Sequence, residues 1–218
     1  GDACGASWIG PCWDRKLDFP SWGVPKFRFA DHDAFALVEV DNDDRAGWLK
    51  GDVAEAEAIR GFRGASLRLK DSGATSELLG FMGYEKVDSK DDWTRYAIAN
   101  GNGADVIDIE TLPSANAARQ GAGSVHHIAF AVEDRAAQLE VRKALMDTGY
   151  NVTPVIDRNY FWAIYFRTPG GVLFEIATNE PGFDADEDTA HLGEALKLPP
   201  QYESHRAKIE DILTPIED

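Results

Sequence analysis

The sequence is poor in cysteine, and this shortage limits the compartments and sites that it favours. Only Cys4 and Cys12 occur among 218 residues, both in an irregular N-terminal stretch. A single disulfide between them is one alternative, but two cysteines without a secretory signal favour a reduced, cytoplasmic protein. A zinc site needs four ligands, and no second Cys/His pair with suitable spacing lies nearby. Both cysteines are therefore expected to be structural or incidental.

Basic residues and long apolar runs are also scarce. The chain has 22 Lys and Arg against 38 Asp and Glu, a formal net charge of −16. The basic residues are scattered, so nucleic-acid phosphates would be repelled and nucleic-acid binding is not expected. No apolar run approaches the roughly 18–20 residues of a membrane span, and no secretory signal peptide opens the chain. The expected partners are a small molecule or another protein chain.

What the sequence does contain is one structural unit written twice. The hydrophobic fraction of 44% and the six tryptophans fit a globular protein with a substantial core. Residues 59–110 and 122–178 each run strand, helix, strand, strand, strand, with β-branched and aromatic residues in the strands. The sequence therefore predicts an α+β fold of repeated βαβββ modules, each curling into half a barrel.

The ends of the two predicted helices carry matching signals. "SGATSELLGFMG" follows Asp71, and "RAAQLEVRKALMDTG" follows Asp134, so each helix begins beside an acid that can cap free amides or meet the helix dipole. The two helices end near Gly83 and Gly149, which suit a left-handed C-cap. A third, partial copy precedes both modules: "KFRFADHDAFALVEV" resembles "IYFRTPGGVLFEIA", two strands around a tight turn.

Chemistry is concentrated in the second full module. Aligning the repeats by their first strands matches His127 with Gly64, and aligning them by their last strands matches Glu175 with Asp108. Only the second module thus has both a histidine at the start of its first strand and a carboxylate in its last. A lone strand histidine is more often a core or edge residue than a metal ligand. The prediction that His127 binds a metal therefore depends on its pairing with Glu175.

Glu175 stands in the middle of the apolar run "VLFEIAT". A buried carboxylate there requires a cation, a metal or a raised pKa, because an unpaired buried charge is costly. A place on the polar face of a half-exposed strand is the alternative. Together His127 and Glu175 suggest two corners of a two-histidine, one-carboxylate face, which holds Fe(II) and leaves positions open for substrate and oxygen.

Three stretches carry a family resemblance: "VHHIAFAV", "VTPVIDRNYFWAIYFRTPGGVLFEIATNEPGF" and "LKLPP". They resemble ring-cleaving extradiol dioxygenases of the hydroquinone-cleaving type, within the vicinal oxygen chelate superfamily, over residues 25 to about 210. The resemblance implies a fold of paired βαβββ modules. It also implies a small aromatic diol and O2 as substrates, with Fe(II), or alternatively Mn(II), as the metal.

The resemblance also implies roles for single residues. In that family the second histidine of the pair and the strand glutamate ligate iron, which matches His127 and Glu175. His126 matches a histidine beside the metal, and we expect a hydrogen bond or acid–base role for it, on the opposite face of the strand unless the strand bends. Arg158 and Tyr165 match an arginine and a tyrosine near the substrate in that family. An arginine can stabilise an oxyanion, and a tyrosine can hold or relay a proton. The alternatives are a surface turn residue for Arg158 and a core aromatic for Tyr165.

The chain departs from the family in one respect. Family members have four modules, and their other histidine ligand lies in the first module, for which this chain has no match. His32, His191 and His205 do not begin the first strand of any module. A partner chain supplying the missing ligand, a fragment of a longer protein, and a degenerate relative that only binds a small molecule, for example a resistance protein, all stay open. Another metal-dependent reaction, such as a glyoxalase-like isomerisation, is the enzymatic alternative.

These observations predict an oligomeric, five-part chain. The parts are an irregular N-terminal arm (1–24), the end of a truncated module with its linker (25–58), a module without metal ligands (59–117), a module with metal ligands (118–180) and an acidic C-terminal tail (181–218).

Overall fold

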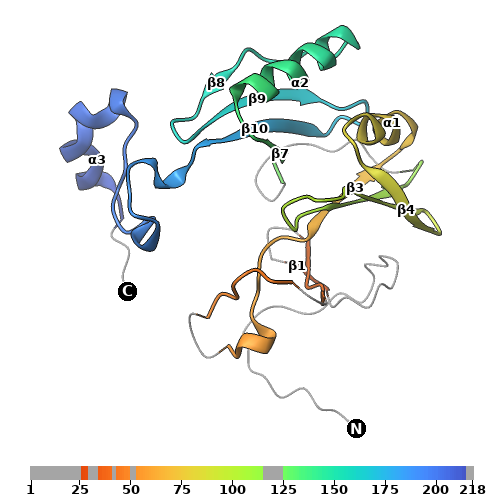
Figure 1. The fold of residues 1–218 in the computed structure, drawn as a ribbon, viewed down its shortest axis with the longest axis horizontal. Coiled ribbons are helices and arrows are strands. Elements are labelled where there is room, and N and C mark those ends of the chain that lie inside the picture. The colour runs from red at the N-terminus through yellow and green to blue at the C-terminus, as the bar shows by residue number, and fades with distance from the viewer. Residues whose placement is uncertain (1–25, 29–33, 41–42, 50–52, 115–124, 215–218) are drawn as a thin grey trace. The chain divides into compact units, whose positions relative to one another are not determined.

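The computed structural model describes residues 26–28, 34–40, 43–49, 53–114 and 125–214 (Figure 1). The predicted N-terminal arm with Cys4 and Cys12, and also His32, lie outside these residues. The chain divides into two compact units, which we describe one at a time. The first comprises residues up to Ile128 together with Arg167–Leu173, and the second comprises Ala129–Phe166 and Phe174–Asp218.

The first unit contains one complete βαβββ module. Its elements are β3 (Gly64–Leu69), α1 (Gly73–Phe81), β4 (Glu85–Lys90), β5 (Trp93–Ala97) and β6 (Val106–Thr111). The strand order is β3-β6-β5-β4, with β3 parallel to β6 and the other pairs antiparallel. The first strand of the module therefore pairs with its last strand.

A short hairpin and a linker precede this module in the chain. β1 (Lys26–Arg28) and β2 (Ala34–Ala36) pair antiparallel, as the predicted partial copy requires. The linker contains one 3-10 turn, η1 (Glu55–Glu57). It carries many exposed apolar side chains, among them Trp48, Ile59 and Phe62.

A second βαβββ module, most of it in the second unit, repeats the plan of the first module. Its elements are β7 (Ile128–Val132), α2 (Arg135–Asp147), β8 (Ile156–Asp157), β9 (Phe161–Arg167) and β10 (Leu173–Pro181), and the strand order is β7-β10-β9-β8. The first and last strands are again neighbours. The predicted α+β fold of repeated βαβββ modules is therefore confirmed.

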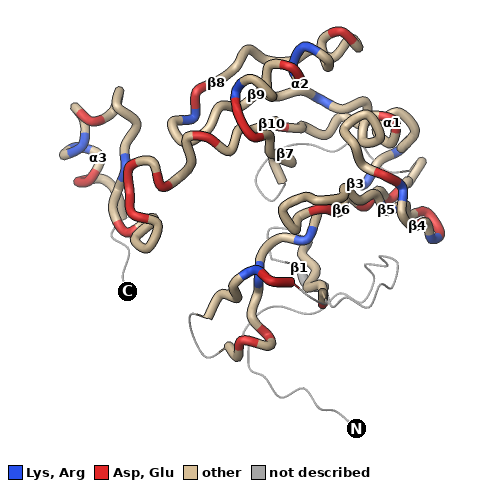
Figure 2. Tube along the Cα trace, in the orientation of Figure 1, with Lys and Arg blue, Asp and Glu red and all other residues tan. Residues whose placement is uncertain are grey.

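The tail follows β10 with short helical turns. These are η2 (Phe183–Ala185), η3 (Thr189–His191), η4 (Pro200–His205) and α3 (Arg206–Ile212). Figure 2 shows acidic residues gathered after β10. The sequence there contains Asp184, Asp186, Glu187 and Asp188. Among the residues that the structure describes, no helix is long and apolar enough to cross a membrane.

Each sheet has one apolar face and one face with polar residues. In the first module Leu67 and Leu69 of β3 are buried with Ile107 and Ile109 of β6, whereas alternate residues on both strands are polar. This alternation follows from the two-residue period of a strand. In the second unit Phe174 packs against Phe130 and Phe166, with ring centroids 4.8 and 5.9 Å apart.

The helix ends lie close to the predicted positions. The Asp134 side chain accepts a hydrogen bond from Ala137 N (2.8 Å) and caps α2, as expected. Asp71 accepts from Gly73 N (2.8 Å) at the start of α1. Gly83 and Gly149, just beyond the two helices, have φ values of 92° and 93°, a conformation that glycine adopts without strain.

The strands are shorter than predicted in two places. The first strand of the second module, which we expect to contain the histidine pair at its start, begins only at Ile128, so both histidines precede β7. The strand expected directly after the second helix is reduced to Ile156–Asp157 and an isolated bridge between Val152 and Phe166. Pro154 interrupts the ladder there because proline has no N–H to donate.

Candidate functional site

Glu175 and Tyr165 form the centre of the candidate site. Glu175 lies on β10 and is 2% exposed, flanked by buried Phe174 and Ile176 as the sequence indicates. The Tyr165 hydroxyl, on the neighbouring strand β9, donates a hydrogen bond to Glu175 Oε1 (2.9 Å). The carboxylate is thus buried and held in a defined orientation, which contradicts its placement on a half-exposed polar face.

Arg158 is the third member of this hydrogen-bonded chain, after Glu175 and Tyr165. It follows β8, and its Nη2 donates to the Tyr165 hydroxyl oxygen (3.1 Å), with the guanidinium carbon 5.6 Å from the tyrosine ring centroid. The Tyr165 hydroxyl therefore accepts one bond and donates another. Burial raises the pKa of Tyr165, and the bond to Glu175 raises it further while the bond from Arg158 lowers it. The Tyr165 bond raises the pKa of Arg158.

The first module has an ion pair at the equivalent place. Arg95 of β5 is opposite Asp108 of β6, and its Nε and Nη2 donate to the two carboxylate oxygens at 2.8 and 2.7 Å. In the second module, Thr168 N donates to Val172 O (2.9 Å) where β9 turns into β10, and counting back from this bond brings Tyr165 opposite Glu175. Tyr165 is thus the counterpart of Arg95: it supplies a hydrogen bond where Arg95 supplies a positive charge.

The two histidines lie together just before β7. Their Nδ1 atoms are 2.8 Å apart, and the rings meet edge to face with centroids 5.1 Å apart. The alternation of side chains expected for a strand does not apply here, because neither residue belongs to β7. His126 therefore contacts His127 directly.

Gly64 explains why the first module has no histidine at the matching position. In the parallel register of β3 and β6, Gly64 is opposite Val106. A Cβ atom on Gly64 would lie 2.1 Å from Val106 O, a distance that no side chain can adopt without moving the backbone. The first module can thus offer a carboxylate at Asp108 but no histidine beside it.

The donor types of the second module fit a divalent transition metal. An imidazole and a buried carboxylate are ligands for Fe(II) or Mn(II), and ligating carboxylates are themselves oriented by hydrogen bonds of the kind that Tyr165 makes. Over the described ranges, no group of three or more His, Cys, Asp and Glu side chains could hold a metal ion. A full ligand set would therefore need a donor from outside those ranges.

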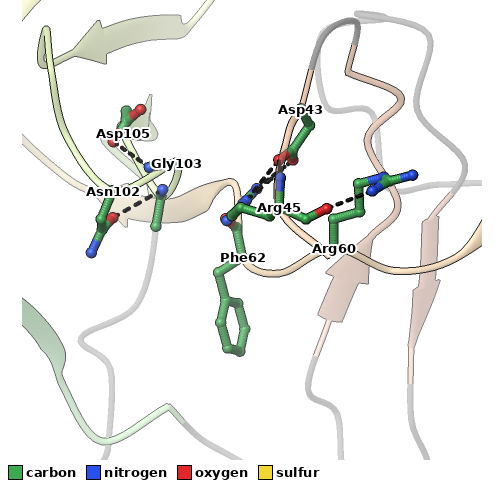
Figure 3. A network of polar contacts seen from close by, with 8 residues as sticks. Asp43, Arg45, Arg60, Phe62, Asn102, Gly103 and Asp105 are labelled. Atoms are coloured by element: carbon green, nitrogen blue, oxygen red, sulfur yellow. Dashed lines mark hydrogen bonds and ion pairs between the residues drawn. The ribbon is translucent and has the colours of Figure 1, made fainter. Parts of the chain in front are cut away.

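A cleft of about 450 Å³ lies elsewhere, between the linker and the β5–β6 loop. Figure 3 shows Arg45 beside it: its guanidinium contacts both oxygens of Asp43 and donates from Nη1 to Phe62 O (2.9 Å). A Cβ atom on Gly103 would lie 2.7 Å from the guanidinium carbon, so Arg45 packs tightly on this loop. Arg45 holds the linker on the module, and we assign the cleft no chemistry.

Sequence reasoning missed Gln138, which shapes the sheet that carries the site. Gln138 on α2 is fully buried, and its Nε2 donates to Trp162 O (2.7 Å) and Ile176 O (2.9 Å), joining β9 to β10. Trp162 N donates to Thr178 Oγ1 (3.0 Å), so side chains complete this part of the ladder. The available signal was that Gln138 lies seven residues before Leu145 in the predicted helix, and therefore on the same face.

Comparisons with known proteins agree with this fold. A family model described as Glyoxalase/Bleomycin resistance protein/Dioxygenase superfamily matches residues 76–176. The chain is 45% identical over 216 residues to MhqO of Bacillus subtilis (strain 168), whose name describes a ring-cleaving dioxygenase, covering 94% of this chain and 69% of that protein. The chain therefore belongs to the Glyoxalase/Bleomycin resistance protein/Dioxygenase superfamily, as its resemblance indicated.

Two further similarities extend this result. The chain is 34% identical over 176 residues to the chlorohydroquinone/hydroquinone 1,2-dioxygenase of Sphingobium indicum, covering 78% of this chain and 54% of that protein. A crystal structure of a Bacillus subtilis protein described as a dioxygenase matches with a TM-score of 0.81 and 43% identity, covering 89% of this chain and 62% of the other. The chain spans about 54–69% of the length of the curated relatives it matches.

Proposed function

We propose that this chain is part or all of an extradiol dioxygenase that opens a hydroquinone- or catechol-like ring with O2 at a mononuclear Fe(II), with Mn(II) as the alternative metal. The observation that carries the proposal is the buried Glu175 carboxylate, which the Tyr165 hydroxyl orients. Glu175 lies on β10, the neighbour of β7, and His127 immediately precedes β7. Relatives named for ring cleavage, one of them for hydroquinone, support the substrate class.

His127 and Glu175 are the proposed metal ligands. His127 immediately precedes β7, and β7 is the neighbour in the sheet of β10, the strand that carries Glu175. The metal would supply Lewis-acid and redox chemistry to the bound diol and O2.

Arg158 and Tyr165 would act on the substrate oxygens. The guanidinium of Arg158 can stabilise negative charge that develops on a phenolic oxygen. The raised pKa of Tyr165 keeps its hydroxyl protonated near neutral pH, so it stays a donor to Glu175 or to an oxygen that replaces this bond. His126 is the third proposed catalytic residue, as an acid–base group beside His127.

The remaining histidine ligand would come from protein outside the described residues. The relatives are longer than this chain, and the linker exposes large apolar side chains such as Trp48, Ile59 and Phe62. Exposed apolar patches of this kind mark surfaces where more protein packs. A longer form of the chain or a second chain would supply the missing donor, and the assembly would be an oligomer in the second case. The intact mass of the purified material and of any co-purifying chain separates these sources.

Anaerobic reconstitution with Fe(II), followed by oxygen uptake with substituted hydroquinones and catechols, tests the proposal. We expect oxygen consumption and a ring-opened product, and Glu175→Gln should abolish both. Asp108→Asn, the matched change in the first module, should leave turnover largely intact. The proposal would be contradicted if the protein, together with any co-purifying chain, bound no iron after reconstitution and consumed no oxygen. The lack of a complete ligand set among described residues would then favour a small-molecule binding protein.

A further inference from the structure

The contact between His126 and His127 restricts the protonation of both rings. A hydrogen bond between two Nδ1 atoms, here 2.8 Å apart, requires one ring to donate and the other to accept. The donor ring carries its proton on Nδ1, and the acceptor ring must be neutral with its proton on Nε2. When both rings are neutral, the two residues therefore hold opposite tautomers for as long as the contact exists.

We propose that His126 is a positioning residue that accepts the Nδ1 proton of His127 and thereby fixes Nε2 of His127 as the ligating nitrogen. The inference rests on the proposed role of His127 as a metal ligand. If His127 accepted instead, its proton would sit on Nε2 and that nitrogen could not bind a metal. Which nitrogen of a histidine binds metal is generally set by the hydrogen bond that the other nitrogen makes.

This role assigns different functions to the two nitrogens of His126. Its Nδ1 lone pair holds His127, and its Nε2 carries a proton that can be donated to a neighbouring oxygen. An acid–base residue would need Nε2 alone, whereas a positioning residue needs an acceptor where Nδ1 lies. The edge-to-face arrangement of the rings also fixes the plane of the His127 imidazole and hence the direction of its Nε2 lone pair.

Three substitutions separate these functions. His126→Asn keeps an acceptor oxygen at the place of Nδ1 and removes Nε2. His126→Gln places its amide near the position of Nε2 and leaves no acceptor near Nδ1. His126→Phe keeps the ring shape and removes both nitrogens. His205, an exposed histidine of the tail, provides the control His205→Asn.

The first measurement needs no metal. In protein with 15N-labelled histidine, long-range 1H–15N spectra report the tautomer of each ring. We expect His127 to carry its proton on Nδ1 in the wild-type chain and in His126→Asn, and to shift toward the Nε2–H tautomer in His126→Phe and His126→Gln. An Nε2–H tautomer of His127 in the wild-type chain, or no change in His126→Phe, would overturn the inference whether or not the protein is a dioxygenase.

The second measurement is the dissociation constant for Mn²⁺, read from the electron paramagnetic resonance signal of the free ion. We expect His126→Phe and His126→Gln to raise this constant by about 10- to 100-fold, the usual effect of losing a residue that orients a ligand. His126→Asn and His205→Asn should bind Mn²⁺ like the wild type. Equal losses in His126→Asn and His126→Phe would overturn the positioning role. A wild-type chain that shows the expected tautomers but binds no Mn²⁺, with or without a co-purifying chain, would refute the metal site of the proposed function, and would overturn metal positioning with it.

Discussion

Tyr165 holds the buried carboxylate of Glu175 at the place where Arg95 holds Asp108 in the preceding module. The two modules thus use the same strand positions to orient a carboxylate, with a neutral donor in one and a cation in the other. A guanidinium neutralises the carboxylate that it contacts, whereas a hydroxyl leaves the charge in place for another cation. This difference is what makes the second module the better candidate for metal binding.

Removing the Tyr165 hydroxyl should weaken the fold as well as the site. Tyr165→Phe deletes a hydrogen bond to a carboxylate that is 2% exposed, and we expect a loss of about 1.5–3 kcal/mol in the free energy of unfolding. Urea denaturation measures it. Tyr202→Phe, on an exposed tyrosine of the tail, should change the same quantity by less than about 0.5 kcal/mol. Equal effects of the two changes would contradict this role.

Arg158 should set the ionisation of Tyr165. The guanidinium lowers the pKa of that hydroxyl, against the larger raising effect of burial. Arg158→Met should therefore raise the pKa of Tyr165 further above its ordinary value of 10.0, so its ionisation moves to higher pH. Absorbance titration of tyrosinate detects the shift, and the same titration on Tyr165→Phe identifies which transition belongs to this residue. A shift to lower pH would refute the contact.

Gly64 should tolerate no side chain. A Cβ atom would lie 2.1 Å from the backbone oxygen of Val106, so Gly64→Ala should cost about 3 kcal/mol of unfolding free energy by forcing β3 away from β6. Thermal or urea unfolding measures the loss. Gly80, near the end of α1, has no atom within 4 Å of the corresponding position. Gly80→Ala should instead stabilise the chain by about 0.5–1 kcal/mol, because alanine is the better helix former.

The ion pair between Asp43 and Arg45, which we call the clamp because Arg45 also binds Phe62 O across the linker, should break in acid. Hydrogen bonds from Arg45 lower the pKa of Asp43 from its ordinary value of 3.8 to about 2. Because this pKa is lowered, the Asp43 carboxylate stabilises the clamp fully at pH values above its ordinary pKa of 3.8. This contribution is lost as the pH falls through the lowered pKa of about 2. Limited proteolysis with pepsin between pH 4 and pH 2 should show cleavage of residues 43–62 rising as pH falls.

The matched variants give the control for that experiment. Asp43→Asn should make the linker sensitive to proteolysis already at pH 4, since a neutral amide cannot replace the carboxylate. Asp44→Asn changes the neighbouring, more exposed carboxyl and should leave the pH dependence unaltered. A linker that is cleaved equally in both variants would show that Arg45 is not what holds it.

Much of the fold follows from local signals in the sequence. The acid before each helix and the glycine after it predict α1 and α2 to within about two residues, because caps and left-handed turns depend on neighbours in the chain. The repeat itself predicts that both modules share one strand order. Strand lengths are less predictable, because they depend on pairing partners: β8 is short where Pro154 breaks the ladder.

The candidate site was predictable in part. Glu175 stands out as a charged residue in an apolar strand, and Tyr165 is found by counting back from the β9–β10 turn once that turn is known. The contact of His126 with His127 was not predictable, since it depends on β7 starting at Ile128 and leaving both residues outside the strand. The bridge that Gln138 makes between β9 and β10 depends on how α2 packs, which no local pattern encodes.

The pairing of the first strand of each module with its last strand has a consequence for biosynthesis. Arg68 on β3 and its partner Glu110 on β6 are 42 residues apart, so β3 leaves the ribosome long before the strand that completes it. Non-local pairings of this kind are slow to form and leave strand edges open meanwhile. β10 is likewise the last strand of its sheet to be translated. Among the candidate site residues of this chain, Glu175 is therefore the last to be translated, after the histidine pair and Tyr165.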